Sequence, residues 1–358
     1  MIKLLVVDDS ALMRRLLGEI FGQEADFEIR MARDGLEALD LLQSYAPDVI
    51  TLDVHMPQMD GLECLDRIMV ERPSPVVMVS ALTAEGADAT FEALRLGAVD
   101  FVAKPDGAVS LGIHELAPIL VRTVRAAAGA KLKPSLRLKE RVRHRLGAAT
   151  RQHKALSRAA AKPADRASGE GLVLVGVSTG GPPALEALLT PLPADFPWPI
   201  VVAQHMPATF TGPLARRLDG LCALAVSEVV EPTLLRPGCA YIGRGDADVI
   251  ISRRAAGLVA MPAPAQKDYP WHPSADRLVR SAMDLAPPKQ LIGVLMTGMG
   301  NDGAQAMTEL HMLGGRTIAE AEESAVVWGM PGELVKAGGA GWIEPLSSIA
   351  LRLRSLTP

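Results

Sequence analysis

The sequence predicts an α/β protein with two domains, each built around a mainly parallel sheet. In both halves, short aliphatic and β-branched runs alternate with amphipathic segments long enough for helices, which is the pattern of βαβ units. Between the halves, residues 131–166 carry twelve Lys or Arg and only two acids, with little aliphatic periodicity. We therefore expect an N-terminal domain at 1–130, a basic, flexible or partly helical linker at 131–167, and a C-terminal domain at 168–358.

Length and composition agree with a folded cytoplasmic protein. A chain of 358 residues with 49% hydrophobic residues can form two substantial cores. No apolar run approaches the roughly 18 residues that a membrane span requires, and the N-terminus begins directly with a strand-like segment. We therefore expect a cytoplasmic location and no membrane insertion. The cysteines, Cys64, Cys222 and Cys239, are odd in number and widely spaced, so they indicate neither a disulfide framework nor a structural zinc site.

Five strands are predicted in the first 130 residues, each followed by an amphipathic segment. Together they predict a doubly wound, five-stranded parallel sheet. The strands are expected at residues 3–7, 28–32, 49–52, 76–80 and 101–102.

Polar side chains stand where these strands end. Asp8, Asp9 and Asp53 would converge at one rim of the sheet, where three carboxylates repel one another unless a divalent cation lies among them. Oxygen ligands of this kind suit Mg²⁺. Lys104 offers a positive charge for a phosphoryl oxygen, and the Ser80 hydroxyl can bond another. A carboxylate in such a pocket can accept a phosphoryl group as an acyl phosphate.

The C-terminal half opens on a strand that runs into a glycine-framed serine. Residues 172–181 read Leu-Val-Leu-Val-Gly-Val-Ser-Thr-Gly-Gly, with a helical pattern after them. Such a turn exposes the Ser178 hydroxyl near the amides of a helix N-terminus, so Ser178 is a candidate nucleophile. A phosphate or dinucleotide cradle is the alternative interpretation. It is weakened because the G-x-G-x-x-G order and the acidic residue about twenty positions later are both absent.

Two further strand ends carry the residues that a serine nucleophile needs. His205 follows the β-branched run that ends at Ala203, and Asp302 lies in a glycine-rich turn after the apolar run that begins at residue 291. In a catalytic triad, the histidine takes the serine proton and the aspartate orients the imidazole and stabilises its charged form. The order Ser, His, Asp differs from the Ser, Asp, His order of α/β-hydrolases, which favours a separate fold with the same chemistry.

The N-terminal half resembles the receiver domain of two-component response regulators. The resemblance implies that Asp53 is phosphorylated, that Asp8 and Asp9 hold Mg²⁺ with it, and that Ser80 and Lys104 contact the phosphoryl group. It also places Phe101 at the aromatic switch position. The motifs that carry it, in chain order, are Asp8-Asp9, Asp53 with Met56-Pro57 and Met59-Asp60-Gly61, Ser80-Ala81, and Lys104-Pro105.

The C-terminal half, joined to such a domain, resembles the chemotaxis protein-glutamate methylesterases of the CheB family. The resemblance rests on Gly-Val-Ser-Thr-Gly-Gly at 176–181, Gln-His-Met-Pro at 204–207 and Met-Thr-Gly-Met-Gly-Asn-Asp-Gly at 296–303. It implies Ser178 as nucleophile and His205 as base, with Asp302 as its partner. The implied substrates are γ-glutamyl methyl esters on chemoreceptor helices, which release methanol, and in many members specific glutamines, which are deamidated. It also implies a chemotaxis histidine kinase as phosphodonor, a receiver that covers the Ser178 site until phosphorylated, and no cofactor for the hydrolysis.

Some features of the cleft remain open at this stage. The oxyanion would lie against amides near Thr179, Gly180 and Gly181 or beside Met299. The family more usually has His-Arg where this chain has Trp271-His272, and the segment 243–248 is also altered. These departures bear on substrate fit more than on hydrolysis.

Two other function classes are considered. A response regulator could carry a second domain that only binds a ligand or partner, with the triad vestigial. Alternatively, the basic segment 131–166 could bind DNA, although no recognition helix or aromatic stacking platform accompanies it, so no nucleic-acid partner is expected. Neither alternative explains why a serine, a histidine and an aspartate all fall at strand ends.

Overall fold

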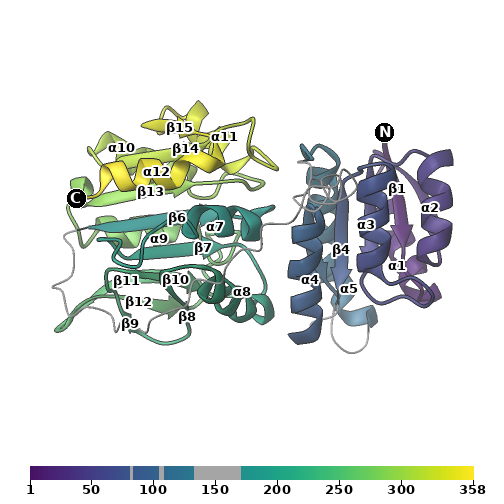
Figure 1. Cartoon of the computed structure of the whole chain (residues 1–358), viewed down its shortest axis with the longest axis horizontal. Helices are drawn as coiled ribbons and strands as arrows, with labels where there is room; N and C mark the ends of the chain where they lie inside the picture. The colour runs from purple at the N-terminus through teal and green to yellow at the C-terminus, as the bar shows by residue number, and fades with distance from the viewer. Residues whose placement is uncertain (81–83, 105–108, 133–170) are drawn as a thin grey trace, which may run out of the picture. The chain divides into compact units, whose positions relative to one another are not determined.

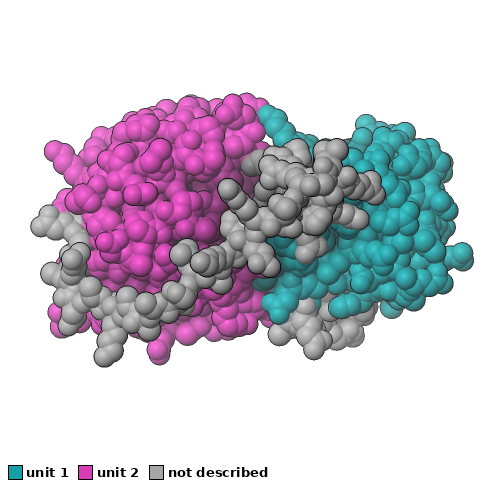
Figure 2. Space-filling view, in the orientation of Figure 1, with its two compact units in different colours: residues 1–155 teal, residues 156–358 magenta. Residues whose placement is uncertain are grey.

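The computed structural model describes residues 1–80, 84–104, 109–132 and 171–358. The chain divides into two compact units, Met1–Ala155 and Leu156–Pro358, which Figure 2 colours separately. Most of the linker expected at 131–167, including its basic segment, lies outside the described residues. Each unit is therefore considered by itself.

The first unit contains a five-stranded parallel sheet with helices packed around it (Figure 1). The strand order is β2-β1-β3-β4-β5, and every pair in that order is parallel. Each predicted strand is present, with ends that differ by no more than one residue. The strands are β1 (Ile2–Val7), β2 (Phe27–Ala32), β3 (Val49–Asp53), β4 (Val76–Ser80) and β5 (Asp100–Ala103). The helices are α1 (Ala11–Gly22), α2 (Gly35–Ser44), α3 (Gly61–Glu71), α4 (Ala84–Leu96) and α5 (Val109–Ala128).

Short polar side chains set where the first three helices begin. Ser10, Asp34 and Asp60 each accept a hydrogen bond from the backbone amide three residues later, which satisfies an amide that has no partner inside the helix. Every residue of β3 and β4 is buried, as expected for central strands covered by helices on both faces.

The second unit is built on a seven-stranded parallel sheet in the order β15-β14-β13-β6-β7-β10-β8. Its strands are β6 (Leu172–Val177), β7 (Ile200–Gln204), β8 (Ala225–Val229), β10 (Cys239–Gly243), β13 (Leu291–Leu295), β14 (Arg316–Glu320) and β15 (Trp342–Glu344). A separate antiparallel sheet contains β9 (Thr233–Leu234), β11 (Asp248–Arg254) and β12 (Gly257–Ala263). The mainly parallel architecture predicted for this half is confirmed.

Within residues 171–358, six α-helices and one short 3-10 helix accompany these sheets. They are α7 (Gly181–Leu189), α8 (Ala208–Leu221), α9 (Ala275–Met283), η1 (Pro288–Gln290), α10 (Ala304–Met312), α11 (Met330–Lys336) and α12 (Leu346–Leu356). No helix among the described residues combines the length and the apolar character needed to cross a bilayer.

The connectivity of the large sheet reverses direction beside β6. Strand β6 lies between β7 and β13, and the chain passes first to β7 and only later to the opposite neighbour, β13 (Figure 1). All six residues of β6 are buried, as are all five of β7 and of β13. Open parallel sheets bind ligands at the carboxyl ends of the strands where the order reverses in this way.

Candidate active site

Ser178, His205 and Asp302 lie after these three adjacent strands. Ser178 directly follows β6, His205 directly follows β7, and Asp302 lies in the turn between β13 and α10. All three are poorly accessible: Ser178 is 7% exposed, and the side chains of His205 and Asp302 are 8% and 2% exposed. The structure therefore brings the three predicted residues to one edge of the sheet.

The turn after Ser178 requires glycine. Gly180 has a φ of +74°, and a Cβ added there would lie 2.8 Å from the side chain of Val326. The amide of Gly181 donates to the Ser178 carbonyl at 2.7 Å, and helix α7 begins at that residue. This tight strand-to-helix turn places the serine beside the N-terminus of α7.

Asp302 is held by four hydrogen bonds. Its Oδ2 contacts Nε2 of His205 at 2.8 Å and accepts the Ala275 amide at 2.6 Å. Its Oδ1 accepts the Ser274 hydroxyl at 2.9 Å and the Asp276 amide at 3.1 Å. The N-terminus of α9 therefore binds the carboxylate that orients the imidazole. This contribution was not predicted, although Ser274 occupies a recognisable helix-capping position before α9.

The contacts of Asp302 favour its charged form. Burial by itself would raise the pKa of this carboxyl. The hydrogen bond and charge of His205, together with the amides of Ala275 and Asp276, outweigh burial and lower the pKa below its ordinary value. An ionised Asp302 can stabilise a positive charge on the His205 imidazole.

The lowered pKa of Asp302 predicts a loss of stability in acid. The unfolded chain takes up this proton near pH 4, whereas the folded protein takes it up only at lower pH, so stability falls as the pH drops through that interval. All four tryptophans lie within residues 171–358, so urea unfolding followed by tryptophan fluorescence reports on this unit. Between pH 6 and pH 3 the wild type should lose more stability than Asp302→Asn. Equal losses would contradict the prediction.

The second nitrogen of the imidazole, Nδ1, has no partner among the residues that the structure describes. Because Nε2 faces the Asp302 carboxylate, the hydrogen-bond network assigns the ring proton to Nε2 and leaves a lone pair on Nδ1. Nδ1 is buried and makes no hydrogen bond among the described residues. Nor do those residues show a hydrogen bond between Ser178 and His205, a contact that commonly tightens only when substrate binds. Nδ1 is thus the nitrogen available to take a proton from Ser178.

Gln204 ties the serine turn to the histidine turn. Its side-chain amide donates to the carbonyl of Ser178 at 3.1 Å and to that of His205 at 3.0 Å. A Cβ at Gly181 would collide with this side chain, which explains the glycine at that position. Gln204 was not predicted as a site residue, although it precedes His205 in the same motif.

Thr297 and Glu320 hold the serine turn from the other side. The Ser178 amide donates to the Thr297 carbonyl at 2.9 Å, and the Thr297 hydroxyl donates to the Thr179 carbonyl at 2.9 Å. Glu320 is fully buried at the end of β14 and accepts the Thr297 amide at 2.8 Å. Neither residue was predicted. A charged residue that closes an apolar strand, as Glu320 does, is the signal that could have identified this support.

Several backbone amides are available for an oxyanion. The amide of Gly181 is engaged within its own turn, as described above. Among the described residues, the amides of Thr179, Gly180 and Met299 make no hydrogen bond. These three amides are the candidate donors to a negative oxygen next to Ser178.

The receiver-like unit brings its predicted residues together as well. One carboxylate oxygen from each of Asp8, Asp9 and Asp53 lies within 4.8 Å of the others. Nζ of Lys104 lies 2.9 Å from Oδ2 of Asp8 and 2.8 Å from Oδ2 of Asp53. Ser80 is fully buried at the end of β4, next to β3, which ends at Asp53. This arrangement leaves Asp53, 5% exposed, at the carboxyl edge of the sheet beside the Lys104 ammonium group.

The acidic group fits a divalent cation. Burial is the largest influence on the Asp53 carboxyl and raises its pKa; the adjacent Asp8 acts in the same direction, and Lys104 opposes both. Three carboxylates this close offer an oxygen-only ligand set of the kind that Mg²⁺ prefers. Asp8, Asp9 and Asp53 are therefore the residues that would hold Mg²⁺. Phe101, expected at the switch position, is 9% exposed on β5.

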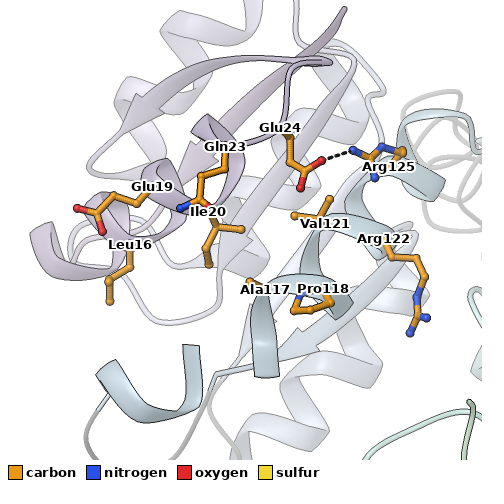
Figure 3. A pocket seen from close by; sticks show the side chains of 10 residues that line it. All are labelled: Leu16, Glu19, Ile20, Gln23, Glu24, Ala117, Pro118, Val121, Arg122 and Arg125. Carbon is orange, nitrogen blue, oxygen red and sulfur yellow. Dashed lines mark hydrogen bonds and ion pairs between the residues drawn. The ribbon is translucent and has the colours of Figure 1, made fainter. Parts of the chain in front are cut away.

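A cavity of about 520 Å³ lies elsewhere on the first unit, between α1 and α5 (Figure 3). Leu16 and Ile20 of α1 and Val121 of α5 form part of its apolar wall, and Arg125 pairs with Glu24 at its rim. No residue of the acidic group lines it. The cavity is thus separate from the candidate phosphorylation site.

Comparison with known proteins identifies the family. Residues 173–353 match the family model of the CheB methylesterase, and residues 4–111 match that of the response regulator receiver domain. The chain belongs to the CheB methylesterase family. The catalytic motifs and the receiver motifs of the sequence lie within these two matched regions.

Relatives in the CheB family align over nearly the whole chain. A protein from Rhodopseudomonas palustris (strain BisB18), named protein-glutamate methylesterase/protein-glutamine glutaminase 2, is 59% identical over 98% of this chain and 96% of its own length. A Vibrio cholerae protein with the same activity name, numbered 3, is 44% identical over 93% of this chain and 90% of its own. The crystal structure of the Thermotoga maritima CheB methylesterase catalytic domain is 35% identical, covers 53% of this chain and all of that chain, and superposes with a TM-score of 0.51.

Proposed function

We propose that this protein hydrolyses γ-glutamyl methyl esters on chemoreceptor helices, with release of methanol, and deamidates specific receptor glutamines. The observation that carries the proposal is the His205 imidazole. It is bound through Nε2 to Asp302, whose pKa is lowered, and its other nitrogen is buried at the strand end next to Ser178 and makes no hydrogen bond within the part of the chain that the structure describes. The family comparisons support this function and not a second domain that only binds a partner or DNA.

The proposed reaction proceeds through an acyl-enzyme. Ser178 Oγ attacks the side-chain carbonyl of the modified glutamate while Nδ1 of His205 takes its proton. The resulting oxyanion lies against the free amides of Thr179, Gly180 or Met299. When the carbon–oxygen bond to the methoxy group breaks, His205 returns the proton and methanol leaves. Water, deprotonated by the same imidazole, then cleaves the ester and restores the serine. With glutamine, ammonia leaves instead.

Incubation with methylated cytoplasmic fragments of a chemoreceptor tests this function. The full-length protein should release methanol, and mass spectrometry of the fragments should show methyl glutamates converted to glutamate. Fragments that carry glutamine at those positions should gain the mass difference of deamidation. Unmethylated fragments in which the same positions are glutamate provide the control. Absence of methanol with every methylated fragment, in the presence of a phosphodonor, would refute the proposal.

We further propose that phosphorylation of Asp53 raises the rate of hydrolysis, with a chemotaxis histidine kinase as phosphodonor. Asp53 would accept the phosphoryl group at a carboxylate oxygen, and Lys104 would bind a phosphoryl oxygen from its position 2.8 Å from that carboxylate. Bound Mg²⁺ would offset the negative charge that the carboxylates and the phosphoryl group bring together. The contacts of Lys104 and the clustered carboxylates support this assignment.

Activation by phosphorylation predicts a specific pattern of rates. A small-molecule phosphodonor with Mg²⁺ should raise methanol release by the full chain and leave Asp53→Asn at its unstimulated rate, because an amide cannot form an acyl phosphate. Asp40→Asn, a change at an exposed acid of α2, should respond as the wild type does. The fragment 168–358 should be active without a phosphodonor. Equal rates for the fragment and for the full chain with and without the phosphodonor would contradict the prediction.

A further inference from the structure

Trp271 lies against the proposed catalytic base. Its ring and that of His205 are parallel within 5°, and their centroids are 6.0 Å apart. This distance and orientation are those of an offset stacked pair, which is one of the favoured arrangements of two aromatic rings. The indole thus contacts the imidazole on a face, away from the ring edge that meets Asp302.

The indole also packs on the turn that carries Asp302. A Cβ added to Gly300 would lie 2.7 Å from Cζ2 of Trp271 and 3.2 Å from Cη2, so the backbone of this turn directly supports the indole. Gly300 also has a φ of +83°, a conformation that glycine adopts without strain. One side chain therefore contacts both the histidine and the turn of its aspartate.

The segment that presents Trp271 is firmly held. The next residue, His272, bonds through Nδ1 to Oδ1 of Asp248 at 2.9 Å. Asp248 is 1% exposed and also accepts the Ser274 amide at 2.7 Å and the Arg277 guanidinium at 2.6 Å. Because Asp248 fixes the segment on both sides of residue 273, Trp271 is presented from an ordered support.

The same segment also reaches Asp302. Ser274 and the first amides of α9 bind the Asp302 carboxylate, as described above. The stretch from Trp271 to Asp276 therefore contacts both members of the His–Asp pair, the imidazole through its face and the carboxylate through hydrogen bonds. A shift of this segment would move both groups.

From these contacts we propose that Trp271 is a positioning residue for His205. It restrains the plane of the imidazole so that Nε2 stays on Asp302 while Nδ1 faces the serine. This inference rests on the proposed function, since it assigns His205 the role of base. The indole Nε1 is buried and has no hydrogen-bond partner among the described residues, so stacking and packing hold the ring in place. An aromatic face is then the property that matters at this position.

Replacing Trp271 by phenylalanine and by leucine distinguishes the effect of an aromatic ring from the effect of apolar volume at this position. In full-length protein with a phosphodonor and Mg²⁺, Trp271→Leu should lower the rate at which diisopropyl fluorophosphate inactivates Ser178, and lower kcat for methanol release, by about 10- to 100-fold, because a small misplacement of the base slows proton transfer strongly. KM should change little. Trp271→Phe should stay close to wild type. Trp342→Leu, a matched change on edge strand β15, should have no effect.

A spectroscopic measurement distinguishes a misplaced His205 imidazole from a general destabilisation of the fold. The Nε2 proton of His205 that faces Asp302 should give a downfield NMR resonance in the wild type and in Trp271→Phe, and should broaden or disappear in Trp271→Leu. Equal inactivation rates for the phenylalanine and leucine variants, or an unchanged resonance in the leucine variant, would overturn the positioning role. A wild type that does not react with diisopropyl fluorophosphate even in the presence of a phosphodonor and Mg²⁺ would instead refute the proposed serine hydrolase site itself.

Discussion

Replacement of Ser178 by alanine is expected to lower kcat for methanol release by about 10⁶-fold, the scale seen when the nucleophile of a catalytic triad is removed. The alanine methyl group cannot form the acyl-enzyme, and neither His205 nor Asp302 provides a substitute nucleophile. Backbone contacts of the turn do not involve the hydroxyl, since the Ser178 amide and carbonyl bond Thr297 and Gln204. The fold should therefore persist while the activity is lost.

The measurement is methanol release from methylated receptor fragments by full-length protein in the presence of a phosphodonor. Ser227→Ala, a change at an exposed serine of β8, is the matched control and should leave the rate unchanged. Thermal unfolding of both variants should resemble that of the wild type. Unchanged methanol release by Ser178→Ala would contradict the proposed mechanism.

Asp302→Asn is expected to lower kcat by about 10⁴-fold, the scale found for loss of the carboxylate from a triad. An amide carries no charge to stabilise the imidazolium that forms when His205 takes the serine proton. An amide also has only one oxygen, so it cannot accept hydrogen bonds at both positions that the two carboxylate oxygens occupy. If its oxygen serves His205 and Ala275, its NH₂ group faces the Asp276 amide, and two donors then oppose each other. The alternative orientation removes the acceptor from Nε2 and favours the wrong tautomer.

This variant should lose stability as well as activity, by about 1–3 kcal/mol, because one buried donor is left unsatisfied. Urea unfolding followed by tryptophan fluorescence measures the loss, and methanol release measures kcat. Asp284→Asn, at the exposed C-terminal end of α9, is the control for the charge change and should affect neither. An Asp302→Asn protein with wild-type kcat would show that His205 does not depend on this carboxylate.

Strands could be predicted well where their burial requires a continuous run of aliphatic residues. The central strands β3 and β4 were predicted nearly to the residue, because parallel strands covered on both faces are buried and largely apolar along their whole length. The antiparallel sheet of β9, β11 and β12 was not predicted. Strand β11 ends in two arginines and β12 contains a proline, so the pattern of residues 248–263 is weaker.

The candidate site could be predicted to the level of its main residues. Ser178, His205 and Asp302 stand out because each follows an apolar run directly or within a glycine-rich turn. The residues that hold these three in place are less conspicuous in the sequence. Thr297 lies within a recognised motif, yet its role depends on Glu320 reaching it from β14. Contacts between segments distant in sequence depend on strand order, which no local pattern contains.

The sequence by itself determined the two α/β units, the glycine turn that exposes Ser178, the acidic group around Asp53 and the family resemblance. These follow from local requirements, namely burial of strands, backbone conformation at glycine and the chemistry of side chains at strand ends. Only the tertiary structure decided which imidazole nitrogen meets Asp302, that α9 binds the same carboxylate, and that Trp271 stacks on His205. Those contacts join segments up to about a hundred residues apart, and their geometry arises only when β6, β7 and β13 become neighbours in the sheet.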